Sequence, residues 1–296
     1  MAVLSSYLAN FLIYTILVIS LNNFVLAKTS IWSVGHIAFW GAGAFLTGWF
    51  MHQRHLDPIV SALASVLLVT DLGILVAVIA VKLRNDYFVI LSLVLVEIVR
   101  VITLQVGGPD GYNNLKRPAL LGIPLANDWV FILVILVPSF AMATFFADRS
   151  KHRPIERISQ FVRQDMEVAN LFGISSSFYQ MGWFVASIAI ASYSGTLFTL
   201  FTRSTDPNTV TIFWSILVFC AAIVGGLNTL EGSVLGGMTF MLPRILEVVF
   251  KMETSFFSSN LIQFLYGIVL IVAIILRPQG VMGDSRIVFA SPISSE

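Results

Sequence analysis

The sequence predicts an all-α, polytopic membrane protein whose helices pack in one bundle. Of its 296 residues, 57% are hydrophobic and only 11% are charged, and the mean hydropathy of +0.89 lies far outside the usage of soluble domains. The apolar residues form long unbroken runs, which suit spanning helices of roughly 20 residues and not the short alternating strands of a membrane barrel. We therefore expect about nine transmembrane helices.

Nine apolar segments are long enough, or nearly long enough, to cross a hydrocarbon core of about 30 Å. In chain order they cover residues 5–27, 31–50, 59–81, 87–106, 129–147, 178–201, 210–224, 233–250 and 259–276. The first lacks the basic start and the small-residue cleavage site of a signal peptide, so we expect it to be retained. Because most loops are short, we expect one transmembrane domain over residues 1–283 and a cytoplasmic tail at 284–296.

Two stretches, residues 33–50 and 225–240, are crowded with Gly, Ala and Ser. Small residues four positions apart, such as Gly232 and Gly236, let helix backbones approach closely inside a membrane. Glycine-rich starts also allow the backbone to break, which is tolerated only where the chain is buried in protein or lines a water-filled cavity. We expect both stretches at the centre of the bundle, as full or as broken spans.

Several charges interrupt the apolar runs. A charge at the middle of a bilayer costs about 2.5–3.5 kcal/mol on insertion scales, so such residues normally face the bundle interior or pair. Glu97 with Arg100, and Arg244 with Glu247, are three residues apart and can neutralise each other along one helix face. Asp71 has no such partner in its own segment. It is a candidate for lining a polar pathway or for an interhelical hydrogen bond.

One polar island, residues 148–174, stands between the fifth and sixth segments. Within it we predict an amphipathic helix over residues 154–172, which begins at Pro154 and ends before Gly173. Its apolar stripe consists of Ile155, Ile158, Val162, Met166 and Ala169. Such a helix lies on the lipid surface or seats its apolar face in a groove of a partner protein.

The distribution of Lys and Arg predicts the orientation of the bundle. If the polar island is cytoplasmic, alternation places more basic residues inside than outside, as the positive-inside rule requires. The N-terminus is then external, and residues 107–128 form the longest external loop.

Several function classes find no support in the sequence. A net charge of +1 gives no surface for nucleic acid, and the lone Cys220 allows neither a disulfide nor a cysteine-based metal site. His36 has no second metal ligand at a suitable spacing, so a capping or packing role is favoured. Because the zinc-protease, nucleophile-elbow and P-loop motifs are also missing, we predict no catalytic residue, no metal and no cofactor bound by this chain.

Five blocks, taken together and in order, resemble the permease subunits of ABC importers for branched-chain amino acids, a family that also includes urea permeases. The blocks are SVGHIAFWGAGAF at 33–45, GGPDGYNN with LGIP at 107–114 and 121–124, the polar island with Arg163 to Asp165 and its terminal Gly-Ile, VGGLNTLEGSVLGG at 224–237, and LYGIVLIVAIILRPQGVMG at 265–283. The sequence departs from the family pattern at residues 154–156, at Asn228, and in VLAKTSIW before the histidine block. These departures suggest a divergent branch and leave the solute open.

The resemblance implies an ATP-driven importer of the bacterial inner membrane. Two permease subunits form the pore for a small polar solute such as a branched-chain amino acid, and we expect a heterodimer, with a homodimer as the alternative. Two ABC ATPase subunits, which bind ATP and Mg²⁺, dock on the cytoplasmic side, and an extracytoplasmic solute-binding protein delivers the substrate. The cytoplasmic loop carries the coupling helix, which lies in a groove of the ATPase.

The residue patterns and the resemblance together suggest three groups of site residues. The ATPase-coupling residues are Ile155, Ile158, Val162, Arg163, Asp165, Met166 and Gly173. The translocation path is expected along Ser33, Gly35, His36, Gly41, Gly43, Asp71, Gly225, Gly226 and Gly232. The loop that faces the binding protein contains Gly108, Asp110 and Gly111.

A function of a different class stays open. An ATP-independent secondary transporter or channel would use the intramembrane carboxylates Asp71, Glu97 and Glu247 as ion or proton sites. The amphipathic helix has no evident use in such a protein. A non-transporting membrane scaffold explains the glycine-rich stretches poorly.

Overall fold

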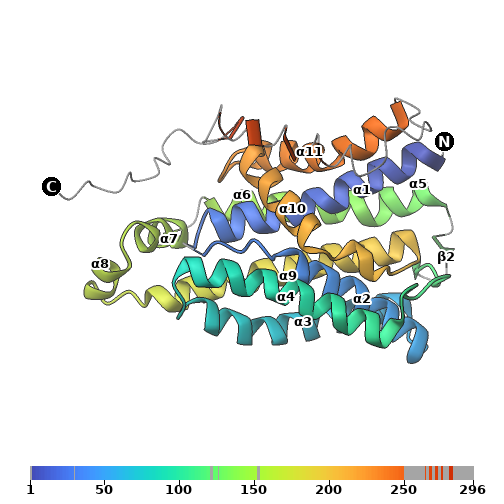
Figure 1. The fold of residues 1–296 in the computed structure, drawn as a ribbon, viewed down its shortest axis with the longest axis horizontal. Coiled ribbons are helices and arrows are strands. Elements are labelled where there is room, and N and C mark those ends of the chain that lie inside the picture. Colours follow the sequence, from blue (N-terminus) through green and yellow to red (C-terminus); the bar gives the residue numbers. More distant parts are fainter. Residues whose placement is uncertain are drawn as a thin grey trace.

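The computed structural model describes residues 2–29, 31–120, 123–125, 127–151, 154–249, 264, 267–268, 271–272, 275 and 280–282. Within them the chain is almost entirely helical, and the helices lie side by side in one elongated bundle (Figure 1). The described part contains one short antiparallel hairpin, in which β1 (Ala119–Leu120) pairs with β2 (Ile123–Pro124). The predicted tail at 284–296 and most of the ninth predicted segment lie outside the described residues.

Five stretches of helix in the described part are long and apolar enough to cross a membrane. The first combines α1 (Ala2–Ile19) with the π-helix η1 (Ser20–Leu26), and the fourth combines α5 (Asp128–Phe131), the π-helix η2 (Ile132–Leu136) and α6 (Val137–Lys151). The other three are α3 (Pro58–Ala80), α4 (Asn85–Gly107) and α9 (Ser176–Thr202). Each agrees with a predicted apolar segment, because a dry bilayer leaves the backbone no hydrogen-bond partners except its own.

Two predicted segments, 31–50 and 210–224, form helices shorter than the five long spans, and each lies next to a break in the backbone. Residues 31–36 are non-helical and α2 (Ile37–Gln53) starts only after them, while α10 (Ile212–Gly225) is separated from α11 (Leu230–Val249) by a turn. At 1.5 Å per residue, α2 and α10 are about 26 and 21 Å long, less than the hydrocarbon thickness.

The core of the bundle forms around α9, which is mostly buried and packs against α1, α2 and α3. Close approach of α2 to α9 depends on glycine. A Cβ atom added at Gly43 would lie 2.6 Å from Ser192 Oγ, and one added at Gly195 would lie 2.8 Å from the carbonyl carbon of Trp40. Small residues thus bring these two helices together, as expected for packing inside a membrane.

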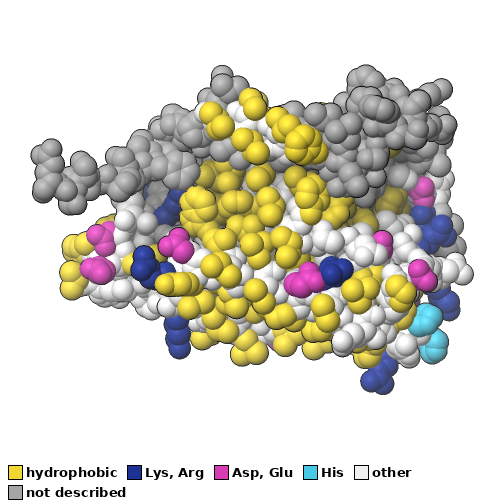
Figure 2. Space-filling model, in the orientation of Figure 1, with side chains coloured by type: hydrophobic (Ala, Val, Ile, Leu, Met, Phe, Trp, Pro, Cys, Tyr) yellow, Lys and Arg dark blue, Asp and Glu magenta, His cyan; other side chains and the backbone are white. Residues whose placement is uncertain are grey.

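The outer face of the bundle is apolar. Helices α3 and α4 are only 22% buried, and they direct large Leu, Ile and Val side chains outward. Figure 2 shows hydrophobic side chains over most of the described part of one face, while charged side chains gather mainly toward the two ends. This arrangement is that of a multi-pass membrane protein.

The polar island and the predicted external loop lie at opposite ends of the bundle (Figure 1). The N-terminal end of α1, α5 and the β-hairpin share one end, and α7 (Pro154–Gln164) with α8 (Met166–Leu171) extends from the other. The loop after α9 joins the first group, where η3 (Pro207–Thr209) precedes α10 and Thr205 pairs with Tyr112.

The helix predicted over residues 154–172 is in fact two helices, which corrects the sequence-based expectation. Asp165 adopts an extended backbone between α7 and α8, and its carboxylate accepts hydrogen bonds from the N–H groups of Glu167 and Val168. An aspartate in this position is an N-cap, so it starts a new helix and does not continue the old one.

Candidate functional site

A buried polar core forms where η1 meets the two breaks in the backbone. Asn22 Nδ2 donates to the carbonyl of Gly226 at 2.8 Å and to Ser233 Oγ at 3.0 Å, and Asn22 Oδ1 accepts from the N–H of Asn228 at 3.1 Å. Ser233 Oγ in turn donates to Asn23 Oδ1 at 2.6 Å. The side chains of Asn22, Asn23 and Ser233 are fully or almost fully buried. The π-helix is therefore bonded directly to the turn between α10 and α11.

The same π-helix is bonded to His36, where the first break ends. Ser20 Oγ donates to the carbonyl of Leu17 at 2.6 Å, and the same hydroxyl oxygen of Ser20 lies 3.1 Å from His36 Nε2. Non-helical residues 31–36 are also held by Ser92, which accepts from the Gly35 N–H at 2.9 Å.

Four buried polar atoms of this core have no hydrogen-bond partner among the described residues: Ser33 Oγ, His36 Nδ1, Asn23 Nδ2 and Asn228 Oδ1. A buried polar atom left unpaired costs about 1–3 kcal/mol. Such atoms are rare in finished cores, and each calls for an explanation in terms of strain, a bound group or function.

The glycines of the predicted path make close packing contacts. A Cβ atom added at Gly35 would collide with the backbone of Ser92, and one at Gly41 with the side chain of Val210. Gly225, Gly226 and Gly232 pack backbone against backbone at the second break. The structure thus brings Ser33, Gly35, His36, Gly225, Gly226 and Gly232 toward one core, while Gly41 and Gly43 lie farther along α2. Whether a solute passes here stays a prediction.

Asp71 lies apart from this core. Its side chain is exposed on α3, next to exposed Leu67, Leu72 and Leu75, and none of the ion pairs among the described side chains involves it. The pair Glu97–Arg100 forms as predicted, with 2.8 Å between Arg100 Nη2 and Glu97 Oε1. The side chains of the other predicted pair lie outside the described residues.

A charged cluster that the sequence analysis missed connects α7 to the residues that follow η1; we call it the Lys28 cluster. The Lys28 ammonium is 1% exposed and contacts the carboxylate of Glu156, Ser150 Oγ at 2.6 Å and the ring of Trp183, whose centroid is 4.3 Å away. Arg163 Nη1 donates to the carbonyl of Ala27 at 3.2 Å, and burial lowers the pKa of its guanidinium, which remains cationic at neutral pH.

The predicted coupling residues divide between two surfaces. Val162 is fully buried against its own chain and Ile158 is half-buried, so this part of the predicted apolar stripe packs within the chain. Met166 is exposed, and Gly173 has the left-handed φ of +76° expected at a helix end. The side chain of Ile155 lies outside the described residues. Sequence reasoning overlooked Leu171 and Phe172, which are 86% and 74% exposed at the tip of this loop.

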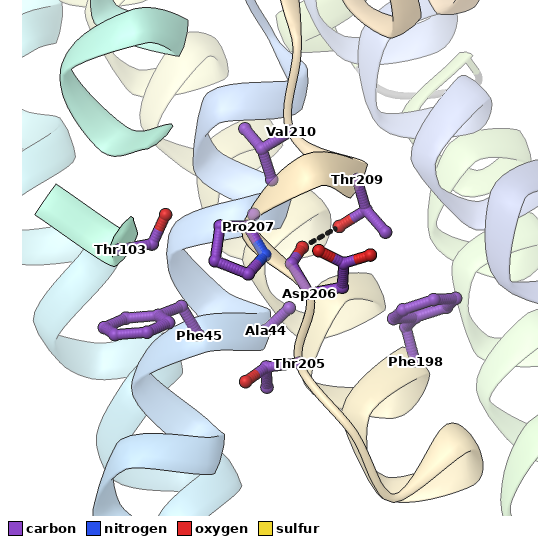
Figure 3. Close-up of a pocket in the computed structure, with 10 residues that line it drawn as sticks. Ala44, Phe45, Thr103, Phe198, Thr205, Asp206, Pro207, Thr209 and Val210 are labelled. Carbon is purple, nitrogen blue, oxygen red and sulfur yellow. Dashed lines mark hydrogen bonds between the residues drawn. The ribbon is translucent and has the colours of Figure 1, made fainter. Parts of the chain in front are cut away.

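At the opposite end, Gly108 and Gly111 adopt φ of +75° and +59°, and Asp110 is exposed between them. A small hollow lies nearby, and Figure 3 shows how it is built. Its lining comes from α2, α4, α9 and the loop before α10: Gly41, Ala44, Phe45, Thr103, Phe198, Thr205, Asp206, Pro207, Thr209 and Val210. The Thr209 hydroxyl donates to the Asp206 carbonyl at 2.7 Å. Nothing in the sequence pattern marked this loop.

No group of three or more His, Cys, Asp or Glu in the described part of the chain could hold a metal ion. The chemistry available at the polar core and at the Lys28 cluster is hydrogen bonding and ion pairing.

Comparisons with known proteins agree with this architecture. Residues 3–274 match the family described as "Branched-chain amino acid transport system / permease component". The permease protein LivM of the high-affinity branched-chain amino acid transport system of Escherichia coli K12 is 23% identical over 301 residues, covering 93% of this chain and 69% of LivM.

Two further relatives match about half of each chain. BraD, a high-affinity branched-chain amino acid transport permease of Pseudomonas aeruginosa, is 26% identical over 56% of this chain and 51% of its own length. LivH of Escherichia coli K12, a permease with the same description, is 22% identical over 53% and 48%. No solved structure matches.

Proposed function

Because the chain belongs to the family of permease components of branched-chain amino acid transport systems, we propose that it forms half of the pore of an ATP-driven importer. The observation that carries this proposal is the family match over residues 3–274. The solute is a small polar molecule such as a branched-chain amino acid, and the setting is the bacterial inner membrane. This chain is a transport subunit, and ATP with Mg²⁺ belongs to separate ATPase subunits.

The tip of the polar island is the proposed ATPase-docking surface, which we define as Met166, Leu171 and Phe172. These side chains are exposed at the end of the molecule opposite the N-terminal end of α1. Large apolar side chains that project from a polar loop are typical of a protein–protein contact. The docking surface therefore lies on α8 and the turn after it, while α7 connects that surface to the bundle.

A second permease and a solute-binding protein complete the proposed assembly. The chain resembles both LivM and LivH, two permeases of one organism, which favours a heterodimer of related subunits. The binding protein is placed at the end that carries Gly108, Asp110 and Gly111, beside the hollow near Thr205.

One observation favours a different mechanism. Asp71 is an exposed carboxylate near the middle of a 23-residue span, and intramembrane carboxylates often mark ion or proton pathways. The competing function is transport driven by an ion gradient without ATP. In the importer, the same carboxylate faces the second permease or the aqueous pore.

Affinity purification of the chain from its native membrane in mild detergent, followed by mass spectrometry, tests the proposal. Recovery of a P-loop ATPase, a second permease and a solute-binding protein is the expected result. Leu171→Glu should abolish recovery of the ATPase, because it places a charge in the docking surface. It should leave recovery of the second permease and the solute-binding protein unchanged. Leu56→Glu makes the same change at an exposed leucine between α2 and α3 and should leave recovery unchanged. Isolation of the wild-type chain without any ATPase would contradict the importer.

A further inference from the structure

The Lys28 cluster stands out because burial of a charge is costly unless it is fully paired. Lys28 and Glu156 have side-chain exposures of 1% and 5% and are in direct contact. Their positions in the sequence are 128 residues apart. A buried pair of this kind contributes little net stability compared with an apolar pair of similar volume, so its presence points to a role in positioning. What it positions is α7 relative to η1.

Three further contacts make this connection stiff. Arg163 holds the carbonyl of Ala27, the residue beside Lys28, and Trp183 Nε1 donates to Ser159 Oγ of α7 at 2.6 Å. The Trp183 ring also packs on Phe24 of η1, with ring centroids 6.0 Å apart. Trp183 therefore touches both α7 and η1 and adds a second connection between them.

The other face of η1 is bonded to both breaks in the backbone. Ser20 contacts His36 at the start of α2, and Asn22 and Asn23 bond the turn that precedes α11 and the first residues of that helix. A seven-residue π-helix is an uncommon structure that concentrates at functional sites. Together with Ala27 and Lys28, which follow it directly and bond α7, η1 forms a continuous segment that reaches from α7 to each break.

The unpaired polar atoms show that this core has hydrogen-bonding capacity to spare. Asn23 Nδ2, His36 Nδ1 and Asn228 Oδ1 are buried donors and acceptors without partners among the described residues. Buried polar atoms without partners call for an explanation, and function is one of the explanations.

We propose that η1 is the relay that carries movement of the cytoplasmic loop to the breaks at His36 and Gly226, and that Lys28 is the positioning residue that attaches α7 to it. This inference rests on the proposed function, because the driving movement comes from the ATPases. Lys28 acts through Glu156 and through the end of the π-helix.

The test uses the complete purified assembly in proteoliposomes and measures solute molecules transported per ATP hydrolysed. The variant is Lys28→Met with Glu156→Met, which removes the ion pair but leaves no lone buried charge. We expect ATP hydrolysis within about twofold of the wild-type rate and a ratio of transport to hydrolysis at least tenfold lower. A structural role alone would lower both activities together.

The matched control is Ser139→Ala with Tyr193→Phe, which removes a 2.7 Å hydrogen bond between α6 and α9 that belongs to none of the proposed sites. Its ratio should equal that of the wild type. A wild-type ratio in the Lys28 and Glu156 variant would overturn the relay while leaving the importer intact. Absence of ATP-driven uptake by the wild-type assembly would contradict the proposed function and the relay together. Because this result is obtained with the wild type, it can be told apart from failure of the relay alone.

Discussion

Replacing Lys28 by Met should destabilise the protein strongly, whereas replacing Lys28 and Glu156 together should not. The single change leaves the Glu156 carboxylate buried, with the hydrogen bond from Gln160 at 3.1 Å among its remaining contacts. Removal of one partner from a buried ion pair costs about 3–5 kcal/mol, but replacement of both by well-packed apolar residues is often neutral or stabilising. The expected difference in unfolding free energy between the single and the double variant is a large part of a typical total stability of about 5–15 kcal/mol.

Thermal unfolding in detergent, followed by intrinsic fluorescence, measures this difference. Lys28→Met should lower the unfolding midpoint by roughly 10 °C, and the double variant should unfold within a few degrees of the wild type. Arg117→Met provides a comparison and should cost less than Lys28→Met, because that pair is more exposed, at 11% and 30%. A double variant as unstable as Lys28→Met would refute the reasoning, since no lone charge would then explain the loss.

Two further predictions follow from packing and from the exposed carboxylate. Gly195→Ala should destabilise the protein by about 1–3 kcal/mol, because the added Cβ meets the Trp40 backbone. Gly182→Ala in the same helix has open space around it and should be neutral or up to about 1 kcal/mol stabilising. Thermal unfolding of both variants measures the difference. Asp71→Asn should leave ATP-driven uptake within about threefold of the wild-type rate in proteoliposomes; complete loss together with loss of ion-gradient coupling would favour the ATP-independent transporter.

The positions of the spans could be predicted from the sequence, and the reason is physical. The third and fourth predicted segments, 59–81 and 87–106, agree closely with Pro58–Ala80 and Asn85–Gly107, because apolar length alone decides where a helix crosses a bilayer. The buried face of each span was not predicted. In α3 the buried positions include the small residues Ser61, Ser65, Gly73 and Ala77, and small residues are typical of helix contacts inside a membrane.

The candidate site could be predicted only in part. Glycine and serine in residues 33–50 and 225–240 indicated close packing, and the structure places the breaks there. The Lys28–Glu156 pair joins residues from distant parts of the chain, so no local pattern indicates it. The apolar stripe of the polar island was recognised, but amphipathicity does not say which body the stripe contacts, and Val162 packs on its own bundle. Asp165 ends the helix through its own side chain, a local effect that periodicity does not register.

ATP-driven uptake by the purified assembly tests the central claim most directly. Proteoliposomes that contain this chain with its co-purified permease and ATPases receive the solute-binding protein and radiolabelled leucine, isoleucine or valine on one side, and ATP with Mg²⁺ on the ATPase side. The importer predicts uptake of at least one labelled amino acid that requires ATP and stops with a non-hydrolysable analogue. Equal uptake by this chain alone, without ATP and driven by an ion gradient, would contradict it.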